Sequence, residues 1–302
     1  MTSTKAGAAW LSVVSNCVLI LLKVVAGVLT GSIAILTEAV HSAIDLIASL
    51  IALVSVRKAD EPADADHPYG HEKAENVAAG AEAMLILLGA AIIVVEAVRR
   101  LINGSEVESV GIGIAIIALS IAVNLIVSAY LYRRARTLES PALEGDAAHL
   151  RADALTSVAV LVGLILVEVT GEASFDSIAA LLVAGAIVAT GIRLATRSGR
   201  VLMDEVLPEQ EMDRIEQVIA DSRPPQMAGY HKLRGRRAGS RRHIDLHVQF
   251  RSGTSLEEAH QEAHRLRDAI EGEFSNADVL IHVEPEESYR PADAGRGPFR
   301  QG

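Results

Sequence analysis

Six long apolar stretches alternate with short polar segments over the first two thirds of the chain. They span residues 9–29, 33–56, 78–101, 110–132, 143–169 and 176–197. Each is long enough to cross about 30 Å of hydrocarbon as a helix. In lipid, a helix also satisfies every backbone polar group within its own segment. The pattern therefore predicts six transmembrane helices.

The segments between these stretches differ in charge. Those expected outside, 30–32, 102–109 and 170–175, contain no Lys or Arg. Basic residues gather in the segments expected inside, namely Lys5, Arg57, Lys58, Lys73, Arg133, Arg134, Arg136 and Arg200. Arg99 and Arg100 lie at the outer end of the third stretch, where long side chains can snorkel to the headgroups. By the positive-inside rule, we expect both termini in the cytoplasm.

Beyond Arg200 the pattern becomes that of a small soluble domain. Its periodicities predict a helix at 209–221, strands at 228–233, 243–250 and 278–283, and a helix that starts at a Thr254 or Ser255 cap and runs to about 274. This order predicts an α+β domain. We therefore divide the chain into a transmembrane domain (1–204), a cytoplasmic domain (205–287) and a disordered tail (288–302).

Composition excludes several classes of protein. Half of the residues are hydrophobic, more apolar than a typical soluble domain, and the net charge of -10 argues against nucleic-acid binding. The single cysteine, Cys17, rules out an internal disulfide and a thiolate metal cluster, and we expect it to be a small buried hydrophobe. The first apolar stretch matches a membrane span rather than the shorter core of a signal peptide.

Ionisable residues inside two of the apolar stretches point to metal chemistry. His41 and Asp45 lie in the second stretch, and His149 and Asp153 lie in the fifth. Each pair is spaced i, i+4, so both side chains leave one face of a helix. Two imidazoles and two carboxylates suit tetrahedral zinc. The alternative is that each pair is a structural hydrogen bond, which accounts for one pair more easily than for two.

Other polar residues in the apolar stretches give weaker signals. Glu38 lies one turn before His41. It can support the metal ligands, carry protons or face the outer water. Arg151 lies between His149 and Asp153 but on another helix face, and its role stays open. The remaining residues are expected to snorkel or to hydrogen-bond neighbouring helices, and they are Asn16, Lys23, Glu82, Glu96 and Glu168.

The segment between the second and third stretches holds a second candidate metal site. Asp64, His67 and His71 can converge there, because Pro68 and Gly70 permit a tight path. The alternative is a solvated polar loop.

Six of the ten histidines lie in the cytoplasmic domain. They are His231, His243, His247, His260, His264 and His282. On the predicted strands, His243 and His247 share a face with Asp245, and His282 shares a face with Glu284. On the predicted helix, His260 and His264 share a face. Histidines clustered with carboxylates predict metal binding at the surface of this domain, although each alone is typical of an ordinary surface residue.

Taken together, these motifs resemble the cation diffusion facilitator family of metal–proton antiporters. The specific parts are His41-Ser-Ala-Ile-Asp45, His149-Leu-Arg-Ala-Asp153 and the loop His67-Pro-Tyr-Gly-His71-Glu-Lys-Ala-Glu75. The resemblance covers residues 8–287. It implies a homodimer with a copper-chaperone-like cytoplasmic fold of order α-β-β-α-β.

The resemblance also implies roles for particular residues. His41, Asp45, His149 and Asp153 match the transport site, and Asp64, His67 and His71 match the loop site. The positions that bind two metals in the cytoplasmic domains of bacterial members correspond to His231, His247, His260, His282 and Glu284. Glu284 stands where a relative has aspartate. Lys73 and Asp204 match a pair that ties the membrane domain near the dimer interface.

The resemblance and the ligand chemistry together imply that the transported metal is zinc. Imidazole at His41 favours borderline zinc over manganese or iron(II), although cadmium, cobalt and nickel accept similar ligands. We expect metal to bind neutral histidines and ionised carboxylates, and protons entering from outside to compete for them. No GxxxxGK[ST] motif for ATP is present. The cytoplasmic domain is expected to sense metal and tighten the dimer.

Two other function classes can be weighed against this one. An intramembrane zinc protease needs HExxH, and here His71-Glu72 is followed by Lys73-Ala-Glu75. A non-transporting metal sensor explains the cytoplasmic histidines but not the intramembrane quartet. A transporter of the same kind for Mn2+, Fe2+ or Cd2+ also stays open. Without eukaryotic targeting signals or a long His-rich loop, the sequence favours a bacterial cytoplasmic (inner) membrane.

Overall fold

The computed structural model describes residues 4–30, 33–103, 111–170, 174–274 and 276–286. The chain separates into two compact units, Met1–Arg200 and Val201–Gly302. The tail 288–302, expected from its sequence to be disordered, lies outside the described residues.

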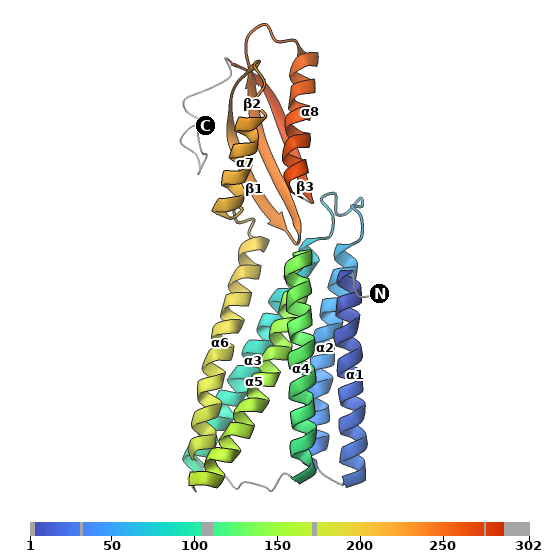
Figure 1. The fold of residues 1–302 in the computed structure, drawn as a ribbon, viewed down its shortest axis with the longest axis vertical. Coiled ribbons are helices and arrows are strands. Elements are labelled where there is room, and N and C mark those ends of the chain that lie inside the picture. Colours follow the sequence, from blue (N-terminus) through green and yellow to red (C-terminus); the bar gives the residue numbers. More distant parts are fainter. Residues whose placement is uncertain (1–3, 31–32, 104–110, 171–173, 275, 287–302) are drawn as a thin grey trace. The chain divides into compact units, whose positions relative to one another are not determined.

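The first unit contains six long helices (Figure 1). They are α1 (Lys5–Thr30), α2 (Ile33–Ala59), α3 (Lys73–Asn103), α4 (Gly111–Leu138), α5 (Pro141–Thr170) and α6 (Ser174–Leu202). All six apolar stretches are therefore helical. Most helices extend beyond their apolar stretch at the end where the basic residues gather, because a charged helical turn remains favourable in water or among headgroups.

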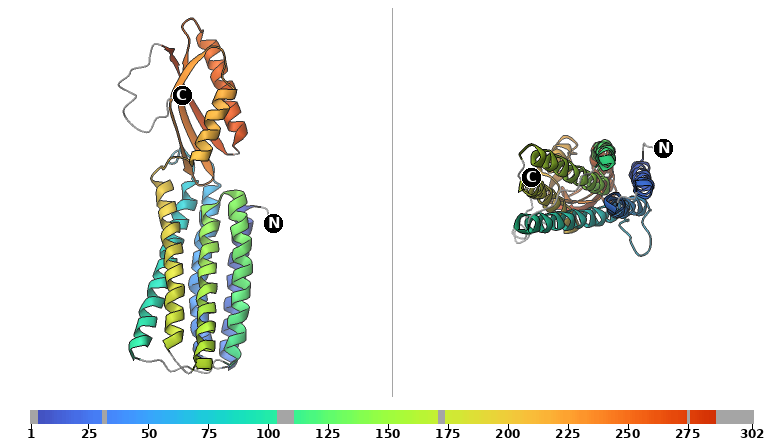
Figure 2. Two further views of the ribbon diagram at one scale, coloured as in Figure 1. Left: turned by 60° about the vertical axis from the view of Figure 1, so that its left-hand side comes forward. Right: turned by 90° about the horizontal axis from the view of Figure 1, so that it is seen from below.

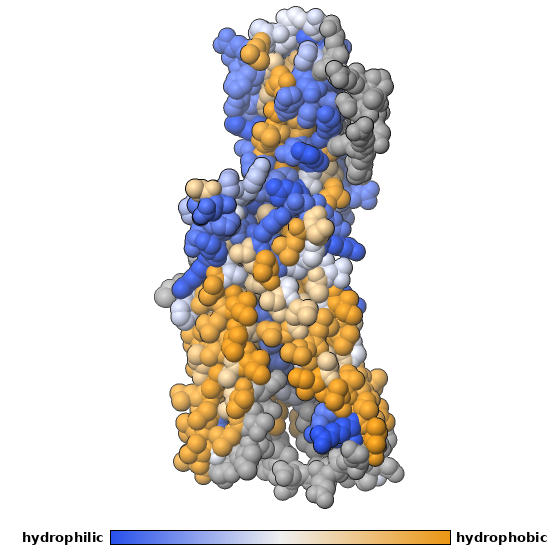
Figure 3. Space-filling view, turned by 180° about the vertical axis from the view of Figure 1, so that it is seen from behind, coloured by the Kyte–Doolittle hydropathy of each residue, from blue (hydrophilic) through white to orange (hydrophobic). Residues whose placement is uncertain are grey.

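Four of these helices are long and apolar enough, over their described residues, to cross a membrane. They are α1, α3, α4 and α6. Large apolar side chains such as Leu29 and Leu182 are exposed along them. Cys17 of α1 is exposed as well, so the expectation that it is buried was wrong. Figure 3 shows a surface over the first unit that is mostly hydrophobic. Helices α2 and α5, which hold the candidate metal donors, are not among the four, so the expectation of six spans stays a prediction.

The helices of the first unit run side by side (Figure 2), and α5 contributes to two of its apolar clusters. One cluster joins α5 to α1, α2 and α4 through residues such as Leu53, Leu131 and Leu150. The other joins it to α3 and α6 through Ala83, Ala152 and Ile187. Alanines are frequent in both clusters and let helix backbones approach closely. Consequently α5 can present polar groups to several helices at once.

The second unit contains two helices and a three-stranded sheet in the order expected from the sequence. The elements are α7 (Glu209–Asp221), β1 (Met227–Ala238), β2 (Arg241–Phe250), α8 (Leu256–Glu273) and β3 (Ala277–Pro285). The strands run in the order β1-β2-β3. β1 pairs with β2 antiparallel, while β2 pairs with β3 parallel, and α8 makes the crossover that a parallel pair needs. The copper-chaperone-like fold implied by the resemblance stays a prediction.

One face of this sheet is covered and the other carries polar groups. Ile244, Leu246 and Val248 of β2 are fully buried in a core that includes residues of α7 and α8. Because side chains alternate along a strand, His247 lies on the opposite face. Ser255 caps the N-terminus of α8. Its hydroxyl accepts the backbone N–H of Glu258, while the Glu258 carboxylate accepts the backbone N–H of Ser255.

Candidate metal centres

Three groups of histidine and acidic side chains converge in the described part of the chain. In each group the donor atoms lie within 4.8 Å of one another. We name them the helix cluster (Asp45, His149 and Asp153), the loop cluster (Asp64, His67 and His71) and the strand cluster (His231, His247 and Glu284). All nine residues are among the candidates that the sequence indicated.

The helix cluster joins α2 to α5 inside the first unit. His149 Nε2 lies 3.5 Å from Asp45 Oδ1 and 3.6 Å from Asp153 Oδ2. Asp45 and His149 are buried, at 4% and 6% exposure. At these separations the donors do not hydrogen-bond one another, and neither Asp45 Oδ1 nor the His149 ring nitrogens have a hydrogen-bond partner among the described residues. Three donors thus surround a small volume that suits a cation.

The expected fourth ligand, His41, belongs to α2 one turn before Asp45. Its side chain lies outside what the structure describes, as does that of Glu38. Both therefore stay sequence predictions.

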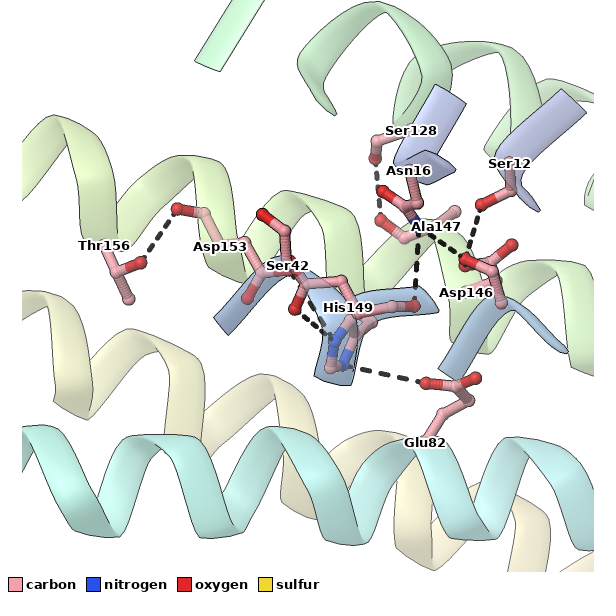
Figure 4. A network of polar contacts seen from close by, with 12 residues as sticks. Ser12, Asn16, Ser42, Glu82, Ser128, Asp146, Ala147, His149, Asp153 and Thr156 are labelled. Carbon is pink, nitrogen blue, oxygen red and sulfur yellow. Dashed lines mark hydrogen bonds and ion pairs between the residues drawn. The ribbon is translucent and has the colours of Figure 1, made fainter. Parts of the chain in front are cut away.

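Two further buried acids lie beside the helix cluster (Figure 4). Glu82 of α3 is fully buried, and its Oε2 lies 3.7 Å from His149 Nδ1. Asp146, one turn before His149, is also fully buried and accepts a 3.1 Å hydrogen bond from the Ser49 hydroxyl. From the sequence, Glu82 was expected only to hydrogen-bond a neighbouring helix, and Asp146 was not among the candidates. The i−3 spacing from His149 could have signalled Asp146, because such residues share a helix face.

Arg151 has a structural role that its sequence position did not reveal. Its guanidinium lies 5.1 Å from the centre of the Tyr132 ring on α4. This cation–π contact explains a charged residue between His149 and Asp153 that points away from the helix cluster.

The loop cluster is organised by Asp64. Its carboxylate accepts the backbone N–H groups of Asp66 and His67, at 3.0 and 2.7 Å. The backbone hydrogen bond from His67 holds the pKa of the Asp64 carboxyl below its ordinary value. His71 Nε2 lies 3.2 Å from the other Asp64 oxygen, and Gly70 has a φ of 89°, which permits the tight turn between the histidines. Asp64 therefore stays anionic and faces two imidazoles.

The strand cluster lies on three neighbouring strands. His231 of β1 is opposite His247 of β2 in the register. Glu284 of β3 lies between them: one carboxylate oxygen is 2.9 Å from His231 Nε2 and the other is 2.6 Å from His247 Nδ1. The register between β1 and β2 shifts directly after His231, and irregularities such as β-bulges commonly re-aim side chains near functional sites. The three donors are thus already joined by hydrogen bonds.

The remaining cytoplasmic histidines lie at the edge of this group or away from it. His282 is exposed, 3.6 Å from Glu284, and its ring contacts that of His247. On α8, the His260 ring contacts His264, with ring centres 4.3 Å apart. His243 faces Asp278 of β3 at 3.2 Å. Within the described residues, His260, His264 and His243 are not among the donors that converge.

The two residues expected to tie the membrane domain near the dimer interface, Lys73 and Asp204, belong to different units of the chain. Lys73 begins α3, and Asp204 follows α6 in the second unit, where its carboxylate lies 3.3 Å from Arg236. Their proposed pairing stays a prediction.

Comparison with known proteins connects both units to cation efflux. The model of the cation efflux transmembrane domain matches residues 9–203, and that of the cation efflux protein cytoplasmic domain matches residues 207–286. The cation-efflux pump FieF of Serratia proteamaculans (strain 568) is 33% identical over 268 residues, which are 89% of this chain and 88% of that protein. The FieF pump of Pectobacterium carotovorum subsp. carotovorum (strain PC1) is 32% identical over 92% of both proteins.

Among solved structures, the metal-bound C-terminal domain of the CzcD transporter from Thermotoga maritima is 26% identical. It covers 28% of this chain and 100% of that chain, with a TM-score of 0.25.

Proposed function

This chain belongs to the cation efflux, or cation diffusion facilitator, family of membrane transporters, and we propose on that premise that it exports Zn2+ from the cytoplasm in exchange for protons. It is a cation efflux transporter rather than an enzyme by its family. The identity of the cation, the coupling to protons and the assembly are the parts that we propose.

The helix cluster is the observation on which the proposal rests. Two carboxylates and an imidazole lie around one buried point, and His41 would complete a tetrahedral set. Imidazole raises the affinity of a site for zinc relative to manganese, which prefers oxygen ligands. Asp45 Oδ1 and both ring nitrogens of His149 are buried without a hydrogen-bond partner among the described residues. Leaving such atoms unsatisfied is costly, so a transported cation that binds them explains why the arrangement persists.

The same ligands make proton exchange a natural coupling. Zinc binds neutral imidazole and ionised carboxylate, so protons and zinc compete for the same atoms. Protons arriving from outside would release the metal, and their loss to the cytoplasm would restore the site.

We propose that the strand cluster, with His260 and His282, binds regulatory metal in a homodimer. A metal ion there would replace the hydrogen bonds that Glu284 makes with His231 and His247. The match to the cytoplasmic domain of the family supports this role. The loop cluster offers a further metal site, and Lys73 with Asp204 would tie the membrane domain near the dimer interface.

The placement in the cell belongs to the same proposal. Six helices would cross the cytoplasmic membrane of a bacterium, with both termini in the cytoplasm. The four apolar helices of the first unit and the bacterial origin of the relatives support it.

The decisive experiment measures zinc flux into proteoliposomes that contain a zinc-sensitive dye, under an imposed pH gradient. Asp45→Asn and Asp153→Asn keep the size of each side chain but remove its charge, so flux driven by the gradient should vanish in both. Arg265→Gln, at an exposed position on α8, is the control and should transport normally.

Three results would change the proposal. Flux of manganese or iron(II) without zinc would replace the substrate, and zinc flux that ignores the pH gradient would remove proton coupling. If folded protein moved no divalent metal, a membrane-bound metal sensor would be the better reading.

A further inference from the structure

Three buried acids of the helical unit differ in how their charge is accommodated. Glu75 is paired with Lys5 at 2.5 Å and also accepts the Ser140 hydroxyl. Asp146 accepts the hydroxyl of Ser49. Glu82 is as deeply buried, yet neither of its carboxylate oxygens has a hydrogen-bond partner among the described residues. An acid kept only for structure would be expected to be hydrogen-bonded, as Glu75 is.

The fold directs Glu82 toward one neighbour. Its carboxylate is 3.7 Å from His149 Nδ1, and Figure 4 shows the two side chains facing each other between α3 and α5. His149 Nδ1 also has no hydrogen-bond partner among the described residues. A donor and an acceptor that both lack partners, separated by slightly more than a hydrogen bond, can satisfy each other through a small side-chain rotation.

A glycine makes this approach possible. A Cβ atom placed on Gly145 of α5 would lie 3.1 Å from both Cβ and Cγ of Glu82 and 3.3 Å from the backbone of Ala79. These contacts are tighter than ordinary packing. Gly145 therefore leaves the space through which the Glu82 side chain passes α5 on its way to His149.

The two nitrogens of His149 thus have different neighbours. Nε2 lies near Asp45 and Asp153, while Nδ1 lies near Glu82. An imidazole can offer a lone pair to a metal at Nε2 only when its neutral form carries its proton on Nδ1. Carboxylates commonly hold histidine ligands in this way, by accepting the N–H that faces away from the metal.

We propose that Glu82 is a positioning residue of the transport site, whose carboxylate accepts the Nδ1 proton of His149 and keeps Nε2 directed at Asp45 and Asp153. The inference rests on the proposed function, because it assumes that the helix cluster binds the transported cation. Glu82 acts through His149 and is not itself a metal ligand in this proposal.

The test compares two substitutions at one position. Glu82→Leu removes the acceptor, and we expect it to raise the zinc concentration for half-maximal flux about 10- to 100-fold while the maximal rate changes less. Glu82→Gln retains a side-chain carbonyl that can accept the same proton, so it should remain within about threefold of the native protein. If leucine has no effect, or if glutamine is as damaging as leucine, the proposal is wrong.

A second measurement does not depend on transport. In the full-length protein labelled with 15N-histidine, the ring nitrogens of His149 can be assigned by their loss in His149→Gln. We expect the native protein to carry the proton of neutral His149 on Nδ1 and Glu82→Leu to show a mixture of tautomers. A proton on Nε2 in the native protein, or no change in Glu82→Leu, would overturn the proposal.

The two measurements also separate this inference from the proposed function. If Asp45→Asn and Asp153→Asn leave zinc flux intact, the transport proposal fails whatever Glu82 does. If they abolish flux while Glu82→Leu changes neither the zinc dependence nor the tautomer, only the role of Glu82 fails.

Discussion

The helix cluster and the strand cluster use the same chemical groups in opposite ways. In the strand cluster, Glu284 is hydrogen-bonded to His231 and His247 at 2.9 and 2.6 Å, and its side chain is 14% exposed. In the helix cluster, Asp45 and His149 are more deeply buried. Asp45 Oδ1 lies 3.5 Å from His149 Nε2, beyond ordinary hydrogen-bond distance.

This difference indicates how each cluster would respond to a cation. At the strand cluster a metal must displace hydrogen bonds that already stabilise the side chains. At the helix cluster, Asp45 Oδ1 and the ring nitrogens of His149 have no hydrogen-bond partner among the described residues, so a cation or protons would bind these atoms without displacing hydrogen bonds. The first arrangement suits a response to metal concentration, and the second suits a site that must exchange one positive ligand for another.

The largest expected effect comes from removing one histidine from each cluster. His149→Gln should reduce zinc flux by about 100-fold or more, because it removes a donor from a buried site with few ligands. His247→Gln should leave the maximal flux within about threefold, because it alters only the proposed regulatory site. Both are measured in the same dye-loaded proteoliposomes. Equal losses in the two variants would abolish the functional distinction between the clusters.

A smaller effect on zinc transport is expected from a change at Gly145, where α5 passes Glu82. Gly145→Ala adds a Cβ within 3.1 Å of the Glu82 side chain, which must shift by a few tenths of an ångström. We expect about a tenfold rise in the zinc concentration for half-maximal flux, at the lower end of losses seen for groups that position a ligand. Gly185→Ala on α6 is the matched control, because nothing lies within 4 Å of its added Cβ. A normal Gly145→Ala protein would show that this close approach is unimportant.

Much of the architecture could be predicted because its signals are local. Helix α7 begins and ends where its amphipathic pattern does, at Glu209 and Asp221. Strand β1 runs over Met227–Ala238, longer than the predicted 228–233, and its alternation is interrupted. A register shift lies between His231 and Arg234, and Lys232 adopts a positive φ of 52°. A bulge of this kind breaks the two-residue period on which strand prediction depends.

The candidate sites likewise contain residues that local spacing predicts and residues that only the packing of helices brings together. The spacing of His149 and Asp153 predicts their shared face because both belong to one helix. The part played by Glu82 could not be predicted, since it depends on where α3 passes α5 and on the space left by Gly145. An isolated acid in an apolar helix does not reveal which neighbour it faces.

The two units also have separate apolar cores, which predicts separate responses to a small cavity. Ile244→Val removes one methyl group from a fully buried side chain of β2 and should destabilise the second unit by about 1 kcal/mol. Hydrogen exchange of the full-length protein should therefore speed up about fivefold at the amides of β2 that exchange by unfolding of this unit, while α5 stays unchanged. Equal acceleration in α5 would mean that the units unfold together.

The smallest expected effect is a pH dependence confined to the second unit. Burial, together with Arg236, lowers the pKa of His243, although Asp278 opposes this shift. The unfolded chain therefore binds the proton more readily than the folded chain, and stability falls as pH drops through about 6.5, the ordinary histidine value, toward the lower folded value. His243→Gln should remove this part of the pH dependence while leaving the stability of the helical unit unchanged. The measurement is hydrogen exchange at β2 between about pH 5 and 8, corrected for the intrinsic exchange rate. If the native and His243→Gln proteins lose protection in parallel on acidification, the burial of His243 contributes nothing to acid sensitivity.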